Sequence, residues 1–221
     1  MSQQRNVLVT GGSNGIGRAV VRRFMRSGDN VWFTYLSGRD RADALLAELR
    51  ETEPNSQIAA FEFSQGDRDS HDNLIAALPG PVDVLVNNSA LGSKTVEQYV
   101  PGPPYQRDAA FLQVNSVGPL WLFQALVPGM LERGYGKVVN VSSVGGGVAA
   151  FPGMQIADGM SKAALAYLTR HAAAQLAHAP VDVFAVCPGA VDTPMFRAKP
   201  AVFILQSAGI VSESGILWLG Q

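Results

Sequence analysis

The feature that most constrains this chain is a run of glycines that follows a short apolar segment near its start. The run covers Thr10 to Gly17, reads TGGSNGIG, and leads directly into a stretch of helical character. Glycine permits a tight turn and a close approach to the backbone, and a helix N-terminus offers free N–H groups and a positive dipole end. A tight turn alone would explain the glycines, but their position between a strand and a helix predicts a pyrophosphate-binding loop.

The rest of the chain alternates short apolar segments with longer helical ones. The predicted strands are nearly continuous in β-branched and aromatic residues, which is typical of strands buried on both faces of a parallel sheet. They cover residues 6–10, 30–35, 57–63, 82–87, 136–141 and 181–186, and the predicted helices cover 15–27, 39–51, 109–133 and 161–178. This alternation predicts an α/β fold with a Rossmann-type, doubly wound parallel sheet, whose ligands bind beyond the carboxyl ends of the strands.

Length and composition narrow the class of protein further. The 221 residues suit one domain over 1–221, and a net charge of -1 gives no basic surface for a nucleic acid. The single cysteine, Cys187, excludes an internal disulfide, and the three histidines lack the spacing of a metal site. We see no signal peptide and expect no membrane-spanning helix, so the expected location is the cytoplasm.

Five motifs, in order along the chain, resemble the short-chain dehydrogenase/reductase family. The Thr-Gly-xxx-Gly-x-Gly spacing is the first, and the others lie in Asp83–Ala90, Val114–Gly118, Gly136–Ser143 and Pro188–Met195. The resemblance implies a domain that binds a nicotinamide dinucleotide and acts on a small-molecule or acyl-thioester substrate. It also implies a homodimer or homotetramer, in which apolar surface of the long helices pairs across a two-fold axis.

The resemblance assigns roles residue by residue. Cofactor binding falls to Gly11, Ser13, Asn14, Gly15, Ile16, Gly17, Arg39, Asn88, Lys162, Pro188, Gly189 and Thr193. The catalytic positions are Asn115, Ser143, Lys162 and the residue four before that lysine, which is Asp158. Where the family usually places an Asp-Val pair near the adenine, this chain reads FEFSQGD over 61–67, and Asp67 is the candidate replacement.

The end of the second predicted strand bears on the choice of cofactor. A free ribose 2′-hydroxyl usually meets an acidic side chain there, whereas arginine accommodates a 2′-phosphate. No acidic residue stands at this strand end, and Arg39 follows closely. The pattern favours NADP(H) over NAD(H), and the alternative is that Arg39 only starts a solvated helix.

Asp158 is the main departure from the family. The family's tyrosine passes a proton to the carbonyl oxygen of the substrate, and its lysine lowers the hydroxyl pKa and holds the ribose. An aspartate side chain is normally a carboxylate at neutral pH and is shorter than a tyrosine, so it replaces that tyrosine poorly. Tyr167 follows Lys162 by about one and a half helical turns, so it is expected to face elsewhere.

Three roles for Asp158 remain open. It could form an i, i+4 helix ion pair with Lys162 and take no part in catalysis. It could take an altered acid–base role. The third alternative is an ordinary reductase in which a water or the substrate supplies the proton.

The region after Met195 also departs from the family. Residues 196–221 do not follow the usual lid and last helix, and Ile216–Leu219 could be a residual strand. Three functions therefore compete, since a fold alone does not choose among them. The first is an NADP(H)-dependent ketoreductase for a 3-oxoacyl or polyketide-like carbonyl. The second is a degenerate relative that binds dinucleotide or partners. The third is a non-redox dehydratase or cyclase that uses Ser143, Asp158 and Lys162.

Overall fold

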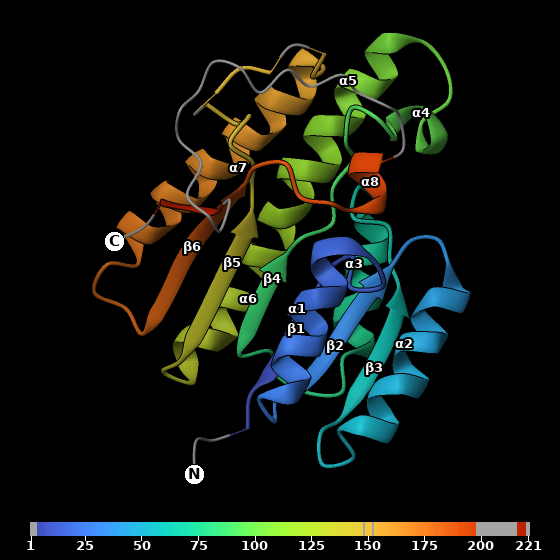
Figure 1. The fold of residues 1–221 in the computed structure, drawn as a ribbon. Coiled ribbons are helices and arrows are strands. Elements are labelled where there is room, and N and C mark those ends of the chain that lie inside the picture. The colour runs from blue at the N-terminus through green and yellow to red at the C-terminus, as the bar shows by residue number, and fades with distance from the viewer. Residues whose placement is uncertain (1–3, 148, 152, 198–215, 220–221) are drawn as a thin grey trace.

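A computed structural model describes residues 4–147, 149–151, 153–197 and 216–219, which form one sheet with helices on both faces (Figure 1). The strands are β1 (Asn6–Val9), β2 (Asn30–Tyr35), β3 (Ile58–Glu62), β4 (Val84–Asn87), β5 (Gly136–Val141), β6 (Val181–Pro188) and β7 (Ile216–Leu219). Their spatial order is β3-β2-β1-β4-β5-β6-β7, and β1 to β6 are all parallel. The predicted doubly wound Rossmann-type sheet is confirmed.

The helices provide the crossovers between these strands. They are α1 (Gly15–Arg26), α2 (Arg39–Thr52), α3 (Arg68–Ala77), α4 (Val96–Tyr99), α5 (Pro104–Leu112), α6 (Gly118–Glu132), α7 (Ile156–Gln175) and α8 (Pro194–Arg197). The sequence prediction missed α3, although Asp67 is an N-cap residue whose Oδ1 accepts from the Asp69 N–H at 3.1 Å. The parallel pairing of β1 with both β2 and β4 needs such crossover helices.

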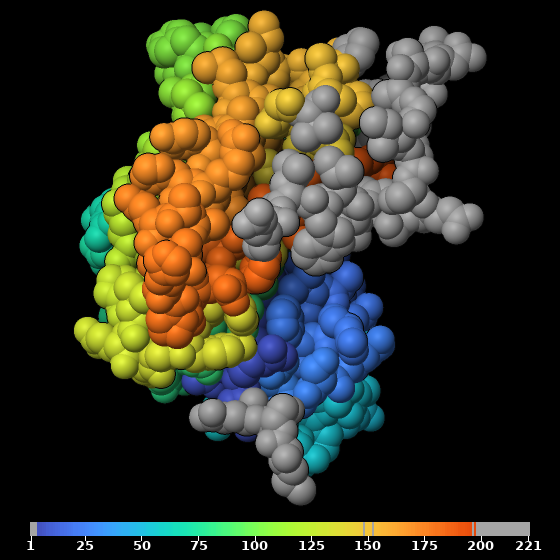
Figure 2. Space-filling view, turned by 90° about the vertical axis from the view of Figure 1, so that its left-hand side faces the viewer, coloured from blue at the N-terminus to red at the C-terminus, as the bar shows by residue number. Residues whose placement is uncertain are grey.

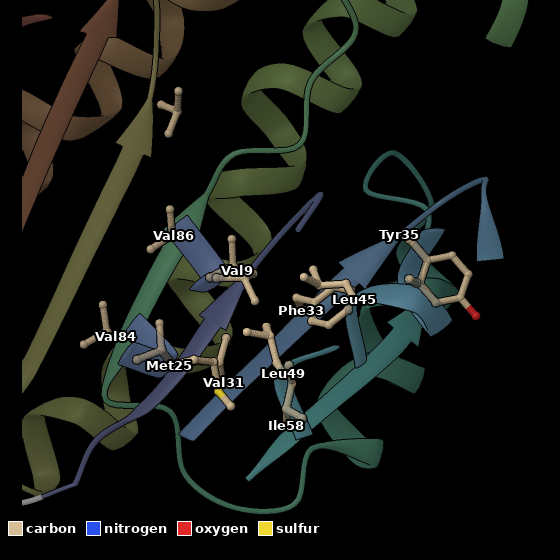
Figure 3. Packing of buried hydrophobic residues seen from close by; sticks show 14 residues of the cluster. Val9, Met25, Val31, Phe33, Tyr35, Leu45, Leu49, Ile58, Val84 and Val86 are labelled. Carbon is tan, nitrogen blue, oxygen red and sulfur yellow. The ribbon is translucent and has the colours of Figure 1, made fainter. Parts of the chain in front are cut away.

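The two faces of the sheet carry separate hydrophobic cores. Val9 and Phe33 point toward α1 and α2, where they pack with Leu45 (Figure 3). Leu8 and Trp32, one residue away on the same strands, pack on the opposite face with side chains from α3, α6 and α7. This alternation follows from the two-residue period of a strand. Each fully buried apolar side chain stabilises the fold by about 1.5–3 kcal/mol.

The long central helix predicted over 109–133 begins earlier and contains an irregularity. It starts at Pro104 and runs through α5, a π-helical turn over Gln113–Val117, and α6. A π turn inserts one extra residue into the hydrogen-bond ladder, and such turns often lie at functional sites. Asn115 is the residue at its centre.

The chain does contain an uncharged stretch of the length that a membrane span needs, which the sequence analysis did not expect. Residues 109–131 contain no Asp, Glu, Lys or Arg, so an uncharged stretch of sufficient length does exist. The helical stretch Pro104–Glu132 has the length of a membrane span. Within it, 18 consecutive residues have the hydropathy of a span, and 33% of them are buried. Helices in the core of soluble proteins meet the same criteria, and Leu122, Val127 and Met130 here pack in the second core.

The C-terminal strand forms as an antiparallel edge. The predicted residual strand Ile216–Leu219 is β7, and it pairs with β6 from Pro188↔Ile216 to Ala185↔Leu219. Most of the atypical segment predicted over 196–221, namely 198–215 and 220–221, lies outside the described residues.

Candidate active site

The glycine loop forms a cradle of backbone between β1 and α1. Gly11 and Gly15 have φ angles of +67° and +50°, which residues with a side chain rarely adopt. A Cβ at Gly17 would lie 2.2 Å from the carbonyl oxygen of Gly11, so no larger residue fits. The N–H groups of the first turn of α1 lack partners within the helix and stand at its positive dipole end.

Side chains from two neighbouring strands fix the shape of this cradle. The Thr10 hydroxyl accepts from the backbone N–H groups of Asn88 at 3.0 Å and Ser89 at 2.9 Å. The Asn88 side chain donates to the carbonyl of Thr10 at 2.9 Å, and the Thr34 hydroxyl accepts from the Gly11 N–H at 3.1 Å. Asn88, predicted to bind cofactor, therefore holds the backbone of the glycine loop.

Two arginines flank the turn after β2. Arg39 is exposed and lies 3.9 Å from the carboxylate of Asp43, one helical turn along α2. The guanidinium of Arg41 lies over Gly38 and donates to the Ser37 carbonyl at 3.4 Å. Arg39 is thus the first residue of the solvated helix α2, and its part in the choice of cofactor stays a prediction. The structure adds Arg41, which the sequence analysis did not single out.

Beside this turn, a shallow hollow opens at the ends of β2 and β3. Leu36, Ser64 and Asp67 are among the residues that line it. Asp67 is therefore placed near the predicted adenine position, although its Oδ1 already caps α3.

The segment after β6 crosses the carboxyl edge of the sheet. At Gly15, a Cβ would meet the Thr193 methyl group at 3.3 Å. At Gly92, in the loop after β4, a Cβ would meet the sulfur of Met195 at 2.8 Å. Three predicted cofactor residues belong to this segment: Pro188, Gly189 and Thr193. They lie at the same edge as the glycine loop.

Asn115 joins the central helix to both sides of the catalytic region. Its Oδ1 accepts from the Leu91 N–H at 2.8 Å, and its Nδ2 donates to the Leu91 carbonyl at 3.0 Å. Nδ2 also donates to the Ser161 hydroxyl at 2.9 Å, which in turn donates to the Asp158 carbonyl at 2.7 Å. Asn115 thus connects the loop after β4 with the start of α7.

Lys162 is buried on α7 against the end of β5. Its Nζ donates to the Val141 carbonyl at 3.0 Å. Burial lowers its pKa from 10.5 to about 8, and the nearby Asp158 and Cys187 oppose that shift. The role of this side chain beside a ribose stays a prediction.

A glycine-rich loop brings Ser143 to the same helix. The Ser143 hydroxyl is half-buried and accepts from the Gly145 N–H at 3.1 Å. A Cβ at Gly146 would lie 2.8 Å from the backbone carbon of Lys162. The loop therefore packs directly on α7, and it retains the Ser143 O–H as a hydrogen-bond donor.

Asp158 is buried in the first turn of α7, and its carboxylate is bound by a serine from another part of the chain. Its Oδ2 accepts from the backbone N–H of Ser93 at 2.9 Å and from the Ser93 hydroxyl at 2.6 Å. The Ser93 hydroxyl accepts from the Gln155 N–H at 3.0 Å. Asp158 thereby ties the loop after β4 to the beginning of α7.

The i, i+4 ion pair between Asp158 and Lys162, one of the three roles left open for Asp158, does not form. Among the described residues no nitrogen of Lys162 lies within 4.0 Å of the Asp158 carboxylate. Each side chain has a better partner, because Ser93 donates to the carboxylate while the Val141 carbonyl accepts from the ammonium. Tyr167 is 62% exposed, so it does face away from this site.

Sequence reasoning missed Ser93, Thr34 and Arg41. Ser93 lies 65 residues from Asp158 along the chain, and a single serine in a loop gives no local signal. Thr34 lies in a predicted strand and Arg41 in a predicted helix, but only the folded chain shows that they contact the glycine loop and Ser37.

The residues at this edge fit a dinucleotide. Glycine at position 17 lets the start of α1 pack closely on the loop after β1, and the helix terminus beside that loop suits a pyrophosphate. A dinucleotide with its pyrophosphate at this loop would have the turn with Arg41 toward one of its ends and Thr193 and Lys162 toward the other.

Comparison with known proteins gives a consistent family. Residues 5–201 match the family model described as short chain dehydrogenase. A 2-(R)-hydroxypropyl-CoM dehydrogenase of Xanthobacter autotrophicus is 31% identical over 197 residues, which cover 86% of this chain and 76% of the relative. A 3-oxoacyl-(acyl-carrier-protein) reductase of Staphylococcus epidermidis is 30% identical over 196 residues, 88% of this chain and 78% of the relative.

Solved structures agree. A 3-oxoacyl-(acyl-carrier protein) reductase with bound NAD from Brucella melitensis has a TM-score of 0.77 and 27% identity. The match covers 87% of this chain and 73% of the reductase chain. A short-chain dehydrogenase from Sphingobium yanoikuyae in complex with NADPH has a TM-score of 0.74 and 25% identity. The match covers 86% of this chain and 73% of the dehydrogenase chain. The chain described here belongs to the short-chain dehydrogenase family.

Proposed function

We propose that this chain is an oxidoreductase that binds a nicotinamide dinucleotide at its glycine loop, with NADP(H) preferred over NAD(H). The observation that carries the proposal is the steric requirement for glycine at position 17, where a Cβ would meet the Gly11 carbonyl at 2.2 Å. Glycine at this position lets the first turn of α1 pack closely on the loop after β1, and this packing brings the N–H groups of the helix terminus to a place where a pyrophosphate can contact them.

The preference for NADP(H) rests on Arg39 and Arg41. Both guanidinium groups are exposed at the end of β2, and no acidic residue lies between Tyr35 and Arg39. Both arginines have long contacts within the protein: Arg39 lies 3.9 Å from the Asp43 carboxylate, and Arg41 lies 3.4 Å from the Ser37 carbonyl. A 2′-phosphate bound there would replace these contacts with charge-assisted hydrogen bonds. Because similar structures hold either NAD or NADPH, the residues of this chain have to decide the preference.

The other predicted residues take roles along the same ligand. The N–H groups around Ser13, Asn14 and Ile16 face the pyrophosphate, and Lys162 holds the ribose. Thr193, with Pro188 and Gly189, borders the nicotinamide amide. Bound there, the cofactor supplies a hydride to an unsaturated carbon of the substrate. Ser143 orients the substrate through its O–H, and Asn115 keeps the loop after β4 against α7.

The first substrate class to test is a 3-oxoacyl or polyketide-like ketone. The 3-oxoacyl reductases among the similar proteins motivate this choice. A ketone needs a proton as well as a hydride, and Asp158 carries no phenolic hydroxyl to supply it. In that case a water or the substrate would be the proton source.

A dinucleotide-binding protein without turnover is the second candidate. The hydrogen bonds from Ser93 favour it, because they use Asp158 as a structural link between two segments. This candidate retains the cofactor site and loses only the chemistry.

An assembly through α7 forms part of the proposal. Ile156, Met160 and Tyr167 are 82%, 53% and 62% exposed on this helix, which faces the viewer in orange in Figure 2. Exposed apolar side chains on a long helix suit a two-fold interface between copies of the chain, in a homodimer or homotetramer. The cytoplasm stays the predicted location.

Two measurements test the proposed function. Fluorescence titration with NADPH and NADH should give a lower Kd for NADPH, and Arg41→Ala should reduce that preference about tenfold. Absence of binding by either dinucleotide at millimolar concentration would contradict the proposal. NADPH oxidation with a short 3-oxoacyl thioester then separates the two candidates. Turnover only in Asp158→Tyr would mean that the site is intact and that only the proton donor is missing.

A further inference from the structure

The hydrogen bonds at Asp158 show which groups donate to its carboxylate. The backbone N–H of Ser93 can only donate, and it points at Oδ2. The Ser93 hydroxyl accepts from the Gln155 N–H, so its own proton is directed at the same oxygen, 2.6 Å away. Oδ2 therefore accepts from two donors. Among the described residues no donor reaches Oδ1, which leaves that oxygen for a ligand.

In these hydrogen bonds the Asp158 carboxylate is the acceptor, whereas the family resemblance places a proton donor at this position. An acceptor carboxylate does not help hydride addition to a ketone, because that addition builds negative charge on the carbonyl oxygen. A carboxylate instead stabilises a cation, most strongly where little water is present. Asp158 is only 6% exposed, so its field is weakly screened.

We propose, resting on the proposed function, that the substrate of this site carries a cationic nitrogen, namely an iminium that is reduced to an amine. Asp158 attracts the C=N⁺ group through Oδ1, and Ser143 contacts the same nitrogen. In the reduction, the nicotinamide dinucleotide supplies the hydride that forms the new C–H bond and is itself oxidised. The π pair of the C=N bond becomes the nitrogen lone pair. No proton has to be donated, so the missing hydroxyl is not needed.

The surroundings of Asp158 are compatible with this role. Lys162 is the nearest buried cation, but its ammonium donates to the Val141 carbonyl rather than to the carboxylate. The carboxylate thus keeps an oxygen that is not taken by an ion pair. Asn115 and Ser161 fix the backbone of this turn from the other side, which keeps Asp158 in place.

Binding of a cationic mimic of the iminium is the first test, and it does not depend on turnover. Calorimetry in the presence of NADPH compares 2-methylpyrrolidine, which is protonated at neutral pH, with the neutral and nearly isosteric 2-methyltetrahydrofuran. The amine should bind at least tenfold more tightly. In Asp158→Asn that difference should disappear, whereas Asp72→Asn, an exposed control on α3, should retain it.

Turnover gives the second readout. NADPH oxidation should be faster with 2-methyl-1-pyrroline than with 2-methylcyclopentanone, and it should slow as rising pH removes the proton from the imine. Equal binding of the amine and the ether by the natural protein would overturn the inference, even if Asp158→Asn does not fold. NADPH binding is measured separately, so a bound cofactor with no preference for the amine refutes only this inference. Absence of NADPH binding would refute the proposed function as well.

Discussion

The glycine loop after β1 and the first turn of α7 lie at the same edge of one sheet, but the sequence constrains them in different ways. At Gly17 the backbone itself forms the site, and a Cβ would meet the Gly11 carbonyl at 2.2 Å. At Asp158 a side chain forms the site, and the helix around it would accept several residue types. A site formed by backbone tolerates no substitution that adds a clashing side chain, whereas a single substitution can change the chemistry of a site formed by a side chain. Cofactor binding and chemistry can therefore change independently.

Gly17→Ala should have the largest effect on cofactor affinity and tests the backbone side of this comparison. The new Cβ clashes with the Gly11 carbonyl and with the Asn88 side chain, so the cradle has to move. We expect a loss of NADPH affinity of about 100-fold, or about 2.7 kcal/mol at 1.36 kcal/mol per tenfold. Fluorescence titration measures it.

Gly28→Ala is the matched control. Gly28 has φ +83° and no neighbour within 4 Å of a Cβ, so alanine adds only backbone strain of about 1 kcal/mol. Its NADPH affinity should stay unchanged. Equal losses of affinity in both variants would mean that the cradle is not the binding site.

The pH dependence of stability tests the burial of Lys162 on the catalytic side. Between its folded pKa of about 8 and its usual 10.5, the unfolded chain binds a proton that the folded chain lacks. The free energy of unfolding therefore rises with pH between about 8 and 10.5, by up to about 3 kcal/mol. Below pH 8 it is lower by this amount than above pH 10.5. Urea unfolding of the natural protein and Lys162→Met from pH 7 to 10 should show the rise only in the natural protein. Parallel curves would contradict the burial of the ammonium.

Ser93→Ala tests the link between the loop after β4 and α7. It removes the hydroxyl that donates to Asp158 and accepts from Gln155, at an expected cost of about 1–2 kcal/mol in the free energy of unfolding. Ser27→Ala, at an exposed helix end, should cost less than about 0.5 kcal/mol. NADPH affinity should be nearly the same in both, and a loss confined to Ser93→Ala would mean that the two regions are coupled.

The smallest expected effect concerns His71, which is buried between the rings of Phe63 and Trp121. Burial lowers its pKa below 6.5, and its Nε2 bonds to the Gln65 carbonyl at 2.9 Å. Below pH 6.5 the unfolded chain takes up a proton that the folded chain resists. Stability should then fall with decreasing pH by at most about 1.4 kcal/mol per pH unit. His71→Phe should flatten the acid side of the stability curve, and an unchanged slope would assign it to other groups.

Local patterns predicted the elements that depend on local physics. The strands around Val9 and Phe33 were recognisable because burial on both faces leaves a continuous apolar run. The helix boundaries were less accurate, since α7 begins at Ile156 rather than Ser161, and α3 was overlooked. The π turn at Asn115 gave no signal, because it depends on packing between the central helix and its neighbours.

The sequence by itself determined the sheet, the glycine cradle and the presence of an aspartate four residues before Lys162. Those features follow from periodicity and spacing, which are properties of neighbouring residues. Only the tertiary structure decided what that aspartate does. Folding brings Ser93 against Asp158 across 65 residues of chain, and two short hydrogen bonds outcompete an ion pair with Lys162 that helical spacing alone would favour.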